Sequence, residues 1–503
     1  MATVQGSAPT RWELSKIILA SSLGTLIEWY DFYLFGALST IIAANFFPKE
    51  NDFAAFLSTL AIFAAGFVVR PFGAIVFGRL GDLAGRKVTF LMTLMIMGLS
   101  TFAIGLIPTY AQVGILAPIL MLILRLIQGL ALGGEYGGAA TYVAEHSPSD
   151  KRGLYTSFLQ TTATLGLFVA LGVIQFTRSS VGEEAFKANG WRYPFLLSLV
   201  LVIFSYFIRR KMHESPAFTR AKEHGKLSKN PLVESFVNPA NRKLVILALL
   251  GATAGQGVVW YTGQFYALSF MVKTLHIAEP IANSIVMKAL LIGTPFFVVV
   301  GWLSDRIGRK KLILAGCLLA ALCYMPLYQR MAATVDTSER PETASTTKRD
   351  KATGIGTRVI QFEDGSVRTE IYDVDKSNPA YGKIGLPPTK MTVKVEPTPA
   401  DQKMLTLLVL VQVLFVTLVY GPIAAFLVEL FPTHIRYTSM SLPYHLGNGV
   451  FGGLVPFIAT ALVGQNGPDP YRGLWYPIGI AMLTFVIGSI FLKEPNKEVF
   501  DQD

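Results

Sequence analysis

The chain has 503 residues, of which 52% are hydrophobic and only 15% are charged, and its formal net charge is +11. A soluble protein carries nearer to a quarter charged residues, so the composition argues against a soluble enzyme or binding module. Lys and Arg lie mainly in the connections between long apolar stretches, which favours a membrane protein over a nucleic-acid-binding face. Cys317 and Cys323 share one apolar stretch and offer neither a disulfide framework nor a metal site.

Twelve apolar stretches are long enough to cross a bilayer as helices. They are residues 17–44, 53–78, 88–107, 114–143, 154–177, 192–209, 244–272, 282–303, 312–329, 404–428, 438–463 and 474–492. An even number places both termini on one side of the membrane. The connection 209–243 holds nine Lys and Arg residues, whereas the connection between the first two spans holds Lys49 alone. Both termini and the connection 209–243 are therefore expected to be cytoplasmic.

Residues 331–403 interrupt this pattern, because they are polar and carry nearly balanced acidic and basic residues. Alternating β-branched residues at 357–362 (TRVIQF) precede the turn-like EDGS at 363–366, and a similar run follows at 391–395 (MTVKV). This pattern predicts a small β-hairpin or sheet, and the topology places it outside the cytoplasm. A tolerated surface insertion is favoured over a lid that captures substrate.

The chain contains an internal repeat. The sequence GRLGDLAGRK at 78–87 recurs as GWLSDRIGRK at 301–310, so the numbering offset between the two copies is 223 (301 − 78). Seven positions from Gln128 to Arg152 recur from Gln412 to Arg436, each at an offset of 284 (412 − 128). The two offsets differ by 61 (284 − 223), and the polar segment accounts for this difference. Parallel repeats of this kind predict two pseudo-symmetric halves with a substrate site between them.

The predicted fold is an all-α polytopic membrane protein of twelve transmembrane helices in two six-helix halves, with a small extracytoplasmic β-rich insertion. Its parts are the N-terminal half (1–209), a cytoplasmic linker (210–243), helices seven to nine (244–330), the insertion (331–403), helices ten to twelve (404–492) and a cytoplasmic tail (493–503).

The first repeat carries an acidic residue and a basic residue around a glycine turn. Asp82 and Asp305 close the second and eighth helices, and Arg86 and Arg309 follow them. A carboxylate at a helix boundary can accept hydrogen bonds from a neighbouring helix N-terminus and pair with arginine. Such ties could hold one face closed and release when the halves rock. Basic residues that only mark topology are the alternative, and the recurrence of the acid with them favours a gate.

These motifs resemble the major facilitator superfamily, in which the loop 78–87 is a signature. The segments 125–129, 133–135 and 145–153 are similar to the metabolite–proton symporter branch, as are IEWYDF at 27–32, HESPAF at 213–218, and 429–437 with 451–453. The resemblance covers all twelve spans and omits the insertion. It implies a bacterial inner-membrane symporter of citrate, 2-oxoglutarate, shikimate, dicarboxylates, or proline and betaine. It implies no cofactor, a proton gradient as energy source, and small metabolites and protons as partners, in a chain expected to act as a monomer.

Ionisable residues at bilayer depth are costly and therefore candidates for function. Glu28 and Asp31 lie near the middle of the first helix, Arg70 lies within the second, and Arg125 and Glu135 lie within the fourth. A buried carboxylate beside arginine stays ionised, and it regains its proton when the arginine turns to an anionic substrate. Asp31 with Arg125 is the preferred coupling pair, with Glu28 as the rival carrier and Glu135 as a further candidate. A static ion network is the alternative.

The substrate path is expected to combine polar and aromatic residues from both halves. Gln256, Trp260 and Gln264 are spaced at i, i+4 and i+8 and so share one helix face, although ordinary packing is the alternative for an aromatic stripe. His445 could titrate near neutral pH or be an ordinary buried histidine. The full set of predicted path residues is Arg70, Gln160, Gln256, Trp260, Gln264, Lys288, Tyr444, His445 and Asn448.

The sequence thus predicts a secondary active transporter that imports a small polar metabolite with protons by alternating access. Arg70, Arg125 and Lys288 favour a carboxylate as substrate. An exporter or uniporter of the same fold, and a transport-derived receptor whose outer segment reports on ligand, remain alternatives. No nucleotide loop of the GxxxxGK[ST] type is present, so neither ATP-driven transport nor an enzyme is expected.

Overall fold

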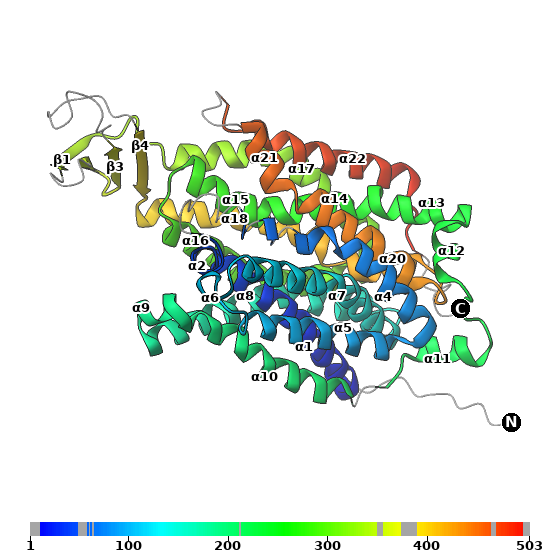
Figure 1. Ribbon diagram of the computed structural model, residues 1–503. Coiled ribbons are helices and arrows are strands. Elements are labelled where there is room, and N and C mark those ends of the chain that lie inside the picture. Colours follow the sequence, from blue (N-terminus) through cyan, green and yellow to red (C-terminus); the bar gives the residue numbers. More distant parts are fainter. Residues whose placement is uncertain are drawn as a thin grey trace.

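The computed structural model describes residues 11–48, 58–59, 61–62, 65–210, 213–349, 356–373, 390–463 and 469–495. Over these residues the chain is a bundle of long helices with a small sheet at one end (Figure 1). Among the described residues, ten helices are long and apolar enough to cross a membrane, or eleven if one bent pair is a single span. The second predicted span, 53–78, lies partly outside the described residues.

The N-terminal half contains long helices at nearly the predicted positions. They are α1 (Arg11–Ala37), α2 (Ser39–Phe46), α4 (Arg70–Ala84), α5 (Arg86–Ile104), α7 (Leu116–His146), α8 (Arg152–Val181) and α10 (Arg192–Arg210), with the short α6 (Tyr110–Val113) and α9 (Glu183–Ala185) between them. The first predicted span, 17–44, is covered by α1 and α2, which meet at a 64° bend.

The C-terminal half repeats this arrangement with more irregular helices. Its elements are α13 (Pro239–Ala248), α14 (Ala254–Tyr261), α15 (Ala267–Ser269), α16 (Glu279–Ile307), α17 (Arg309–Thr334), α18 (Pro399–Tyr420), α19 (Ile423–Leu430), α20 (Arg436–His445), α21 (Val455–Val463) and α22 (Trp475–Phe491). The seventh span is continuous only through π-helical segments at 249–253, 262–266 and 270–274, and another at 446–452 extends α20. Such segments widen the helix and shift the register of the side chains that follow.

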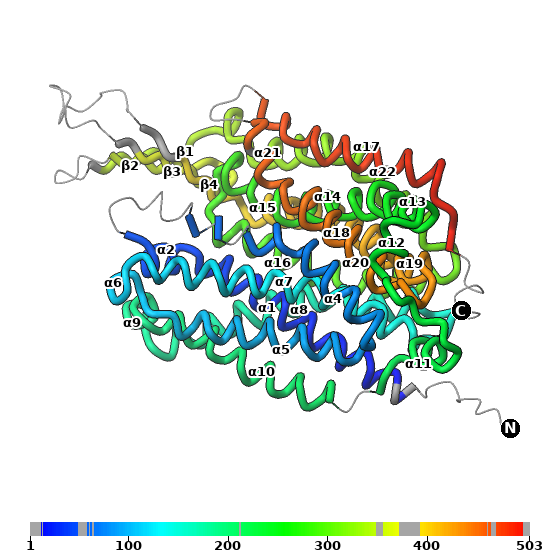
Figure 2. The backbone as a smooth tube through the Cα atoms, turned by 45° about the vertical axis from the view of Figure 1, so that its right-hand side comes forward, coloured from blue at the N-terminus to red at the C-terminus, as the bar shows by residue number. Residues whose placement is uncertain are grey.

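Figure 2 shows the two halves side by side, the N-terminal half in blue to teal and the C-terminal half in green to red. The linker between them contains α11 (Pro216–Glu223) and α12 (Pro231–Phe236), at the end of the bundle away from the sheet. Arg209 was counted with the basic residues of this linker, and that placement is wrong. It lies within α10 and only 1% of its side chain is exposed.

The insertion forms an antiparallel sheet in the order β1-β2-β3-β4, which confirms the predicted β structure. The strands are β1 (Glu342–Arg349), β2 (Gly356–Phe362), β3 (Val367–Asp373) and β4 (Lys390–Glu396). β4 is also bonded to the loop between the seventh and eighth spans, since Val395 N donates to His276 O at 2.7 Å and Ala278 N donates to Val395 O at 3.1 Å. The sheet projects from the end of the bundle opposite to the start of α1 and the end of α22 (Figure 1).

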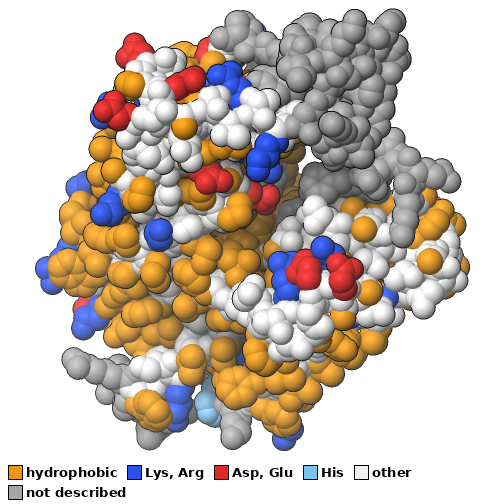
Figure 3. Space-filling model, turned by 90° about the vertical axis from the view of Figure 1, so that its left-hand side faces the viewer, with side chains coloured by type: hydrophobic (Ala, Val, Ile, Leu, Met, Phe, Trp, Pro, Cys, Tyr) orange, Lys and Arg blue, Asp and Glu red, His pale blue; other side chains and the backbone are white. Residues whose placement is uncertain are grey.

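The outside of the bundle is apolar, as a lipid-facing surface requires. Large hydrophobic side chains such as Phe176, Leu291 and Phe457 are more than half exposed. Viewed from the sheet end, hydrophobic side chains cover much of the circumference, with charged side chains scattered among them (Figure 3). Because the helices satisfy their own backbone groups, they can present such a surface to lipid.

Candidate functional site

The first repeat loop ties the second helix to the eleventh. The Asp82 carboxylate accepts hydrogen bonds from the backbone N–H groups of Tyr437, at 3.3 Å, and Thr438, at 2.8 Å, in the first turn of α20. Arg86 Nη2 lies 3.1 Å from the same carboxylate, and both side chains are fully buried. Gly85 separates them at φ 114°, a conformation that glycine adopts readily, so α4 can end and α5 begin within one residue.

The second repeat loop makes the same tie between the eighth helix and the fifth. Asp305 accepts from the backbone N–H groups of Gly153 and Leu154, both at 2.8 Å, in the first turn of α8. Arg309 Nη2 lies 2.9 Å from Asp305, and Gly308 between them has φ 111°. Each predicted carboxylate therefore accepts from the N-terminus of a helix in the other half.

Two further glutamates complete these clusters, and the sequence argument gave them no role. Glu145 lies 2.8 Å from Arg436 and 3.6 Å from Arg86. In the other half, Glu429 lies 2.8 Å from Arg309 and 3.7 Å from an arginine at the start of α8. Glu145 and Glu429 are one of the pairs in the repeat with offset 284, so the signal was present in the sequence.

A second pair of glutamates caps the helices that follow the repeat loops. Glu214, after the sixth span, accepts from the backbone N–H groups of Arg86 and Lys87. Glu494, after the last span, accepts from those of Arg309 and Lys310. Carboxylates at helix N-termini are stabilising. Each of these two caps lies within one half, next to the ties that Asp82 and Asp305 make between the halves.

The pair preferred for coupling is formed within the N-terminal half. Arg125 Nη1 lies 2.7 Å from Asp31 Oδ2, and both side chains are almost fully buried. Gln128 holds the pair from one turn away, donating to Asp31 Oδ1 at 3.0 Å and accepting from Arg125 at 2.8 Å. Gln128 was identified only as a repeat position, and its contact with Asp31 could not be read from the sequence.

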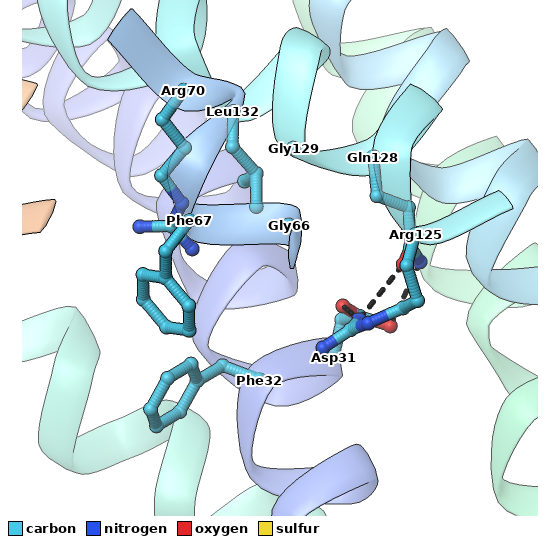
Figure 4. Close-up of a pocket in the computed structure, with 9 residues that line it drawn as sticks. All are labelled: Asp31, Phe32, Gly66, Phe67, Arg70, Arg125, Gln128, Gly129 and Leu132. Carbon is cyan, nitrogen blue, oxygen red and sulfur yellow. Dashed lines mark hydrogen bonds and ion pairs between the residues drawn. The ribbon is translucent and has the colours of Figure 1, made fainter. Parts of the chain in front are cut away.

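A small pocket adjoins this pair (Figure 4). Asp31 and Arg125 lie on one side of it, and Arg70 with Phe67 lies on the other. Arg70 Nη1 is 3.7 Å from Glu28 Oε1, a looser contact than that between Asp31 and Arg125. Two ion pairs of different tightness therefore flank one pocket in the membrane interior.

Glu135 belongs to a separate ion pair. Its carboxylate lies 2.7 Å from Arg209 Nη2 and also accepts from Thr93 at 2.9 Å. Arg209 in addition donates to the backbone carbonyl of Phe90 at 2.9 Å. The three acids predicted for coupling, Glu28, Asp31 and Glu135, thus each contact a different arginine. The arginine that contacts Glu135 comes from the sixth span.

Between the halves, polar and aromatic side chains meet at the pseudo-symmetry axis. The rings of Tyr136 and Tyr444 stack with centroids 3.7 Å apart, and Gln160 donates to the Tyr136 hydroxyl at 2.8 Å. The hydroxyls of Tyr420 and Tyr444 are 3.0 Å apart. Tyr136 and Tyr420 are another repeat pair, so the repeat places equivalent tyrosines against one another.

The predicted path residues of the C-terminal half are only partly brought together. Gln256 and Asn448 exchange hydrogen bonds at 3.0 and 2.9 Å. The Trp260 ring packs on Trp29 at 5.1 Å. The shared face predicted for residues 256, 260 and 264 is interrupted, because the π-helical segment 262–266 shifts the register before the buried Gln264.

Lys288 does not join the central cluster. Its side chain is exposed on the face of α16 that also carries the exposed Leu291 and Ile292. That face is the lipid-facing one, so the structure gives no support to Lys288 as a path residue.

Three buried polar atoms of the central region have no hydrogen-bond partner within the described residues: Gln160 Oε1, Trp260 Nε1 and His445 Nε2. Buried polar atoms are nearly always paired, so such atoms mark places where water or a ligand completes the structure. No group of three or more His, Cys, Asp or Glu residues in the described ranges could hold a metal ion.

Known proteins match this chain over most of its length. The model of the sugar (and other) transporter family matches residues 16–234 and 222–348. The glycine betaine/proline/ectoine/pipecolic acid transporter OusA of Dickeya dadantii is 30% identical over 96% of this chain and 83% of its own length. The alpha-ketoglutarate permease of Escherichia coli is 30% identical over 98% and 96%. The solved proton:xylose symporter XylE aligns with a TM-score of 0.70 at 16% identity, covering 97% of this chain and 98% of its own. This likeness supports the predicted fold of twelve helices in two halves.

Proposed function

The chain belongs to the major facilitator superfamily, in the family of sugar and other transporters, and we propose that it imports a small carboxylate-bearing metabolite together with protons. As a member of this family it is a secondary transporter of the inner membrane and not an enzyme. Transporters of this architecture work by rocking one half against the other around a central site.

The observation that carries the proposal is the buried Asp31–Arg125 pair beside a pocket. A carboxylate in this position is stabilised as an anion while arginine contacts it. When the arginine turns to an anionic substrate, the carboxylate loses its partner and takes up a proton. Gln128 donates to Asp31 Oδ1, the oxygen that does not contact Arg125. Asp31 therefore keeps one hydrogen bond whether it is ionised or protonated. Proton and substrate binding are coupled in this way through one arginine.

The proposed substrate site lies between this pocket and the tyrosine cluster. Arg70 reaches the pocket with only a loose contact to Glu28, so it is a second cation that a carboxylate could engage. The unpaired atoms of Gln160, Trp260 and His445 offer donors and acceptors for the remaining polar groups. Relatives named as carriers of citrate with protons and of alpha-ketoglutarate support a carboxylate.

The test separates exchange from accumulation in proteoliposomes. Asp31→Asn is a permanent mimic of the protonated acid. It should retain exchange of labelled for unlabelled substrate across the membrane and lose accumulation driven by a pH gradient. Arg125→Ala should impair both, because it leaves the acid buried without its partner. Citrate, 2-oxoglutarate and betaine, each labelled, form the substrate panel.

Glu28→Gln is the matched control, since Glu28 lies one helical turn earlier in α1. Accumulation preserved in Asp31→Asn but lost in Glu28→Gln would transfer the proton to Glu28. Accumulation preserved in both would remove the first helix from coupling. A wild-type protein that binds substrate but never accumulates it would favour the receptor alternative. Accumulation only when the direction of the pH gradient is reversed would indicate an exporter.

A further inference from the structure

A second cavity, of about 490 Å³, lies where the sheet meets the bundle. Its size is within the usual range of about 300–1,000 Å³ for small-molecule sites. The walls come from four places: the end of the seventh span, the end of α17, strands β3 and β4, and the segment before α22. Its polar lining residues are Thr274, His276, Gln329, Asp336, Thr337, Arg368 and Tyr471.

The walls of this cavity are held together by hydrogen bonds. β4 is bonded through Val395 to the loop at His276, as described above. On the other side, Arg340 donates to Asp401 at the start of α18, at 3.0 Å, and to the carbonyl of Thr334 in α17, at 2.7 Å. Arg340 also pairs with Asp364 in the turn between β2 and β3. The sheet is therefore fastened to the C-terminal half at two separate points, which gives the cavity a defined shape.

One wall of the cavity is basic. Arg368 projects from β3 on the face that carries the buried Val395 of β4. One Arg368 Nη atom lies 3.1 Å from Glu370, whereas its Nε is buried and has no hydrogen-bond partner among the described residues. His276 lines the same cavity at φ 56°, a conformation that is uncommon for a residue other than glycine. Burial and the neighbouring Arg368 lower the pKa of His276, so its imidazole is neutral at pH 7 and Arg368 supplies the charge.

The lining also contains an acidic residue. Asp336 follows α17 and accepts from the backbone N–H of Ser338 at 2.9 Å. That bond holds the pKa of Asp336 below its usual range, so the carboxylate is ionised at neutral pH. Tyr471 lies within reach of the Asp336 charge and packs against Phe270, with ring centroids 6.1 Å apart. The lining of this cavity thus includes a phenol and a carboxylate as well as a guanidinium and an imidazole.

We propose that this cavity is a second substrate site that binds a small zwitterion, with its carboxylate on Arg368 and its cationic group toward Asp336 and Tyr471. The Arg368 charge is balanced by Glu370, but its Nε has no hydrogen-bond partner among the described residues and can donate to the ligand carboxylate, while Asp336 offers a carboxylate to the cationic group. A cationic ammonium group also interacts favourably with the face of an aromatic ring. The inference rests on the proposed function in one respect, because it takes the ligand to be the transported metabolite. The site would capture the metabolite before it reaches the pathway.

The experiment measures binding to the full-length protein in nanodiscs by calorimetry. The zwitterionic probes are glycine betaine and proline, and citrate and choline are the singly signed controls. Wild-type protein should bind a zwitterion at two sites. Arg368→Ala should weaken one of them by about 10- to 100-fold, the usual effect of removing a charge-assisted hydrogen bond. Arg368→Lys should restore part of the affinity. In uptake assays Arg368→Ala should raise KM and leave kcat unchanged.

Two further variants control for folding and for charge. Asp336→Asn removes the acidic charge but keeps the oxygen that accepts from Ser338, so the turn should survive while one site is lost. Lys394→Ala removes a positive charge from the exposed, opposite face of the same sheet and should leave both sites intact. In each variant, binding at the site that the substitution does not touch shows that the protein is still folded.

The proposal is overturned if wild-type protein shows one site that Arg368→Ala leaves unchanged. It is also overturned if citrate or choline occupies the Arg368-dependent site as tightly as glycine betaine does. A failure of the proposed function looks different. In that case neither the wild type nor any variant would show proton-driven accumulation, but the Arg368-dependent binding would persist.

Discussion

The tie at Asp82 should hold the end of the bundle away from the sheet closed, and Asp82→Asn should open that end. The substitution keeps the side-chain shape but removes the charge that accepts from the backbone of Tyr437 and Thr438. The two N–H groups bond to different oxygens of Asp82, and an Asn amide has only one acceptor oxygen, so one bond survives as a neutral bond and the other is lost. Hydrogen bonds to charged groups contribute about 1.5–3 kcal/mol and neutral ones about 0.5–1.5 kcal/mol, so the surviving bond weakens by about 1 kcal/mol and the lost bond costs about 1.5–3 kcal/mol. Loss of the Arg86 contact at 3.1 Å adds to this, although Glu145 at 3.6 Å still faces that arginine.

The total effect is about 2–4 kcal/mol on the closed state. Because each 1.4 kcal/mol is a factor of ten, the equilibrium should shift by about 30- to 700-fold toward the state in which this end is open. Spin labels on Leu83 and Ile307, both exposed near this end of the bundle, report the change as a longer inter-label distance. The two native cysteines, Cys317 and Cys323, are replaced first.

Substrate affinity separates this gate from the substrate site. Asp82→Asn should alter the rate of exchange more than it weakens binding, since no contact of Asp82 lies near the central tyrosines. Asp305→Asn, which removes the same charge from the other repeat, is expected to shift the distances in the same direction. Unchanged distance distributions in both variants would refute the gate. Collapse of binding with unchanged exchange rates would assign the loop to the substrate site instead.

Three other outcomes are expected. Ser345→Cys in β1 should react with an impermeant maleimide in intact cells, and labelling only after lysis would reverse the predicted orientation. Arg340→Ala should make the sheet more sensitive to protease, because it removes bonds to α17, α18 and the β2–β3 turn; Arg358→Ala, which breaks only contacts within the sheet, should not. Gly81→Val should also disfavour the closed end, because even a Cβ at Gly81 would lie 2.0 Å from the Tyr437 ring. Normal exchange and unchanged inter-label distances in that variant would contradict the tight α4–α20 contact.

The sequence predicted the parts of the structure that depend on local pattern or on the repeat. Apolar length located the spans, and alternation located the sheet at 357–362 and 391–395. Positions of side chains across the bundle were less accessible. Arg209 was assigned to a connection because it follows an apolar run, yet it is buried by its pairing with Glu135. Lys288 was read as a path residue from its depth alone, and depth does not say which way a helix face points.

The i, i+4, i+8 spacing predicted for the seventh span is not kept, for a different reason. Helical spacing assumes the regular α-helical turn, and π-helical segments do not keep it. Nothing in the composition of residues 249–274 distinguishes these segments from an ordinary apolar helix. Glu214 and Glu494 were missed because a capping carboxylate after a span looks like any other residue of a polar connection.

The repeat also distinguishes the residues that close one end of the bundle from those proposed to couple protons to transport. The gate recurs in both halves, with Asp82 and Asp305 in equivalent contacts. The buried charges do not recur, since the same repeat offset that relates Glu145 to Glu429 places Val409 opposite Arg125 and Val419 opposite Glu135. The C-terminal half therefore contributes to the closed end without an arginine at the position equivalent to Arg125. Closing this end of the bundle does not require the charge of Arg125. The presence of Arg125 in one half only therefore needs another reason, and proton coupling supplies one. For the same reason Asp31→Asn should still change conformation with substrate bound while losing its response to a pH gradient.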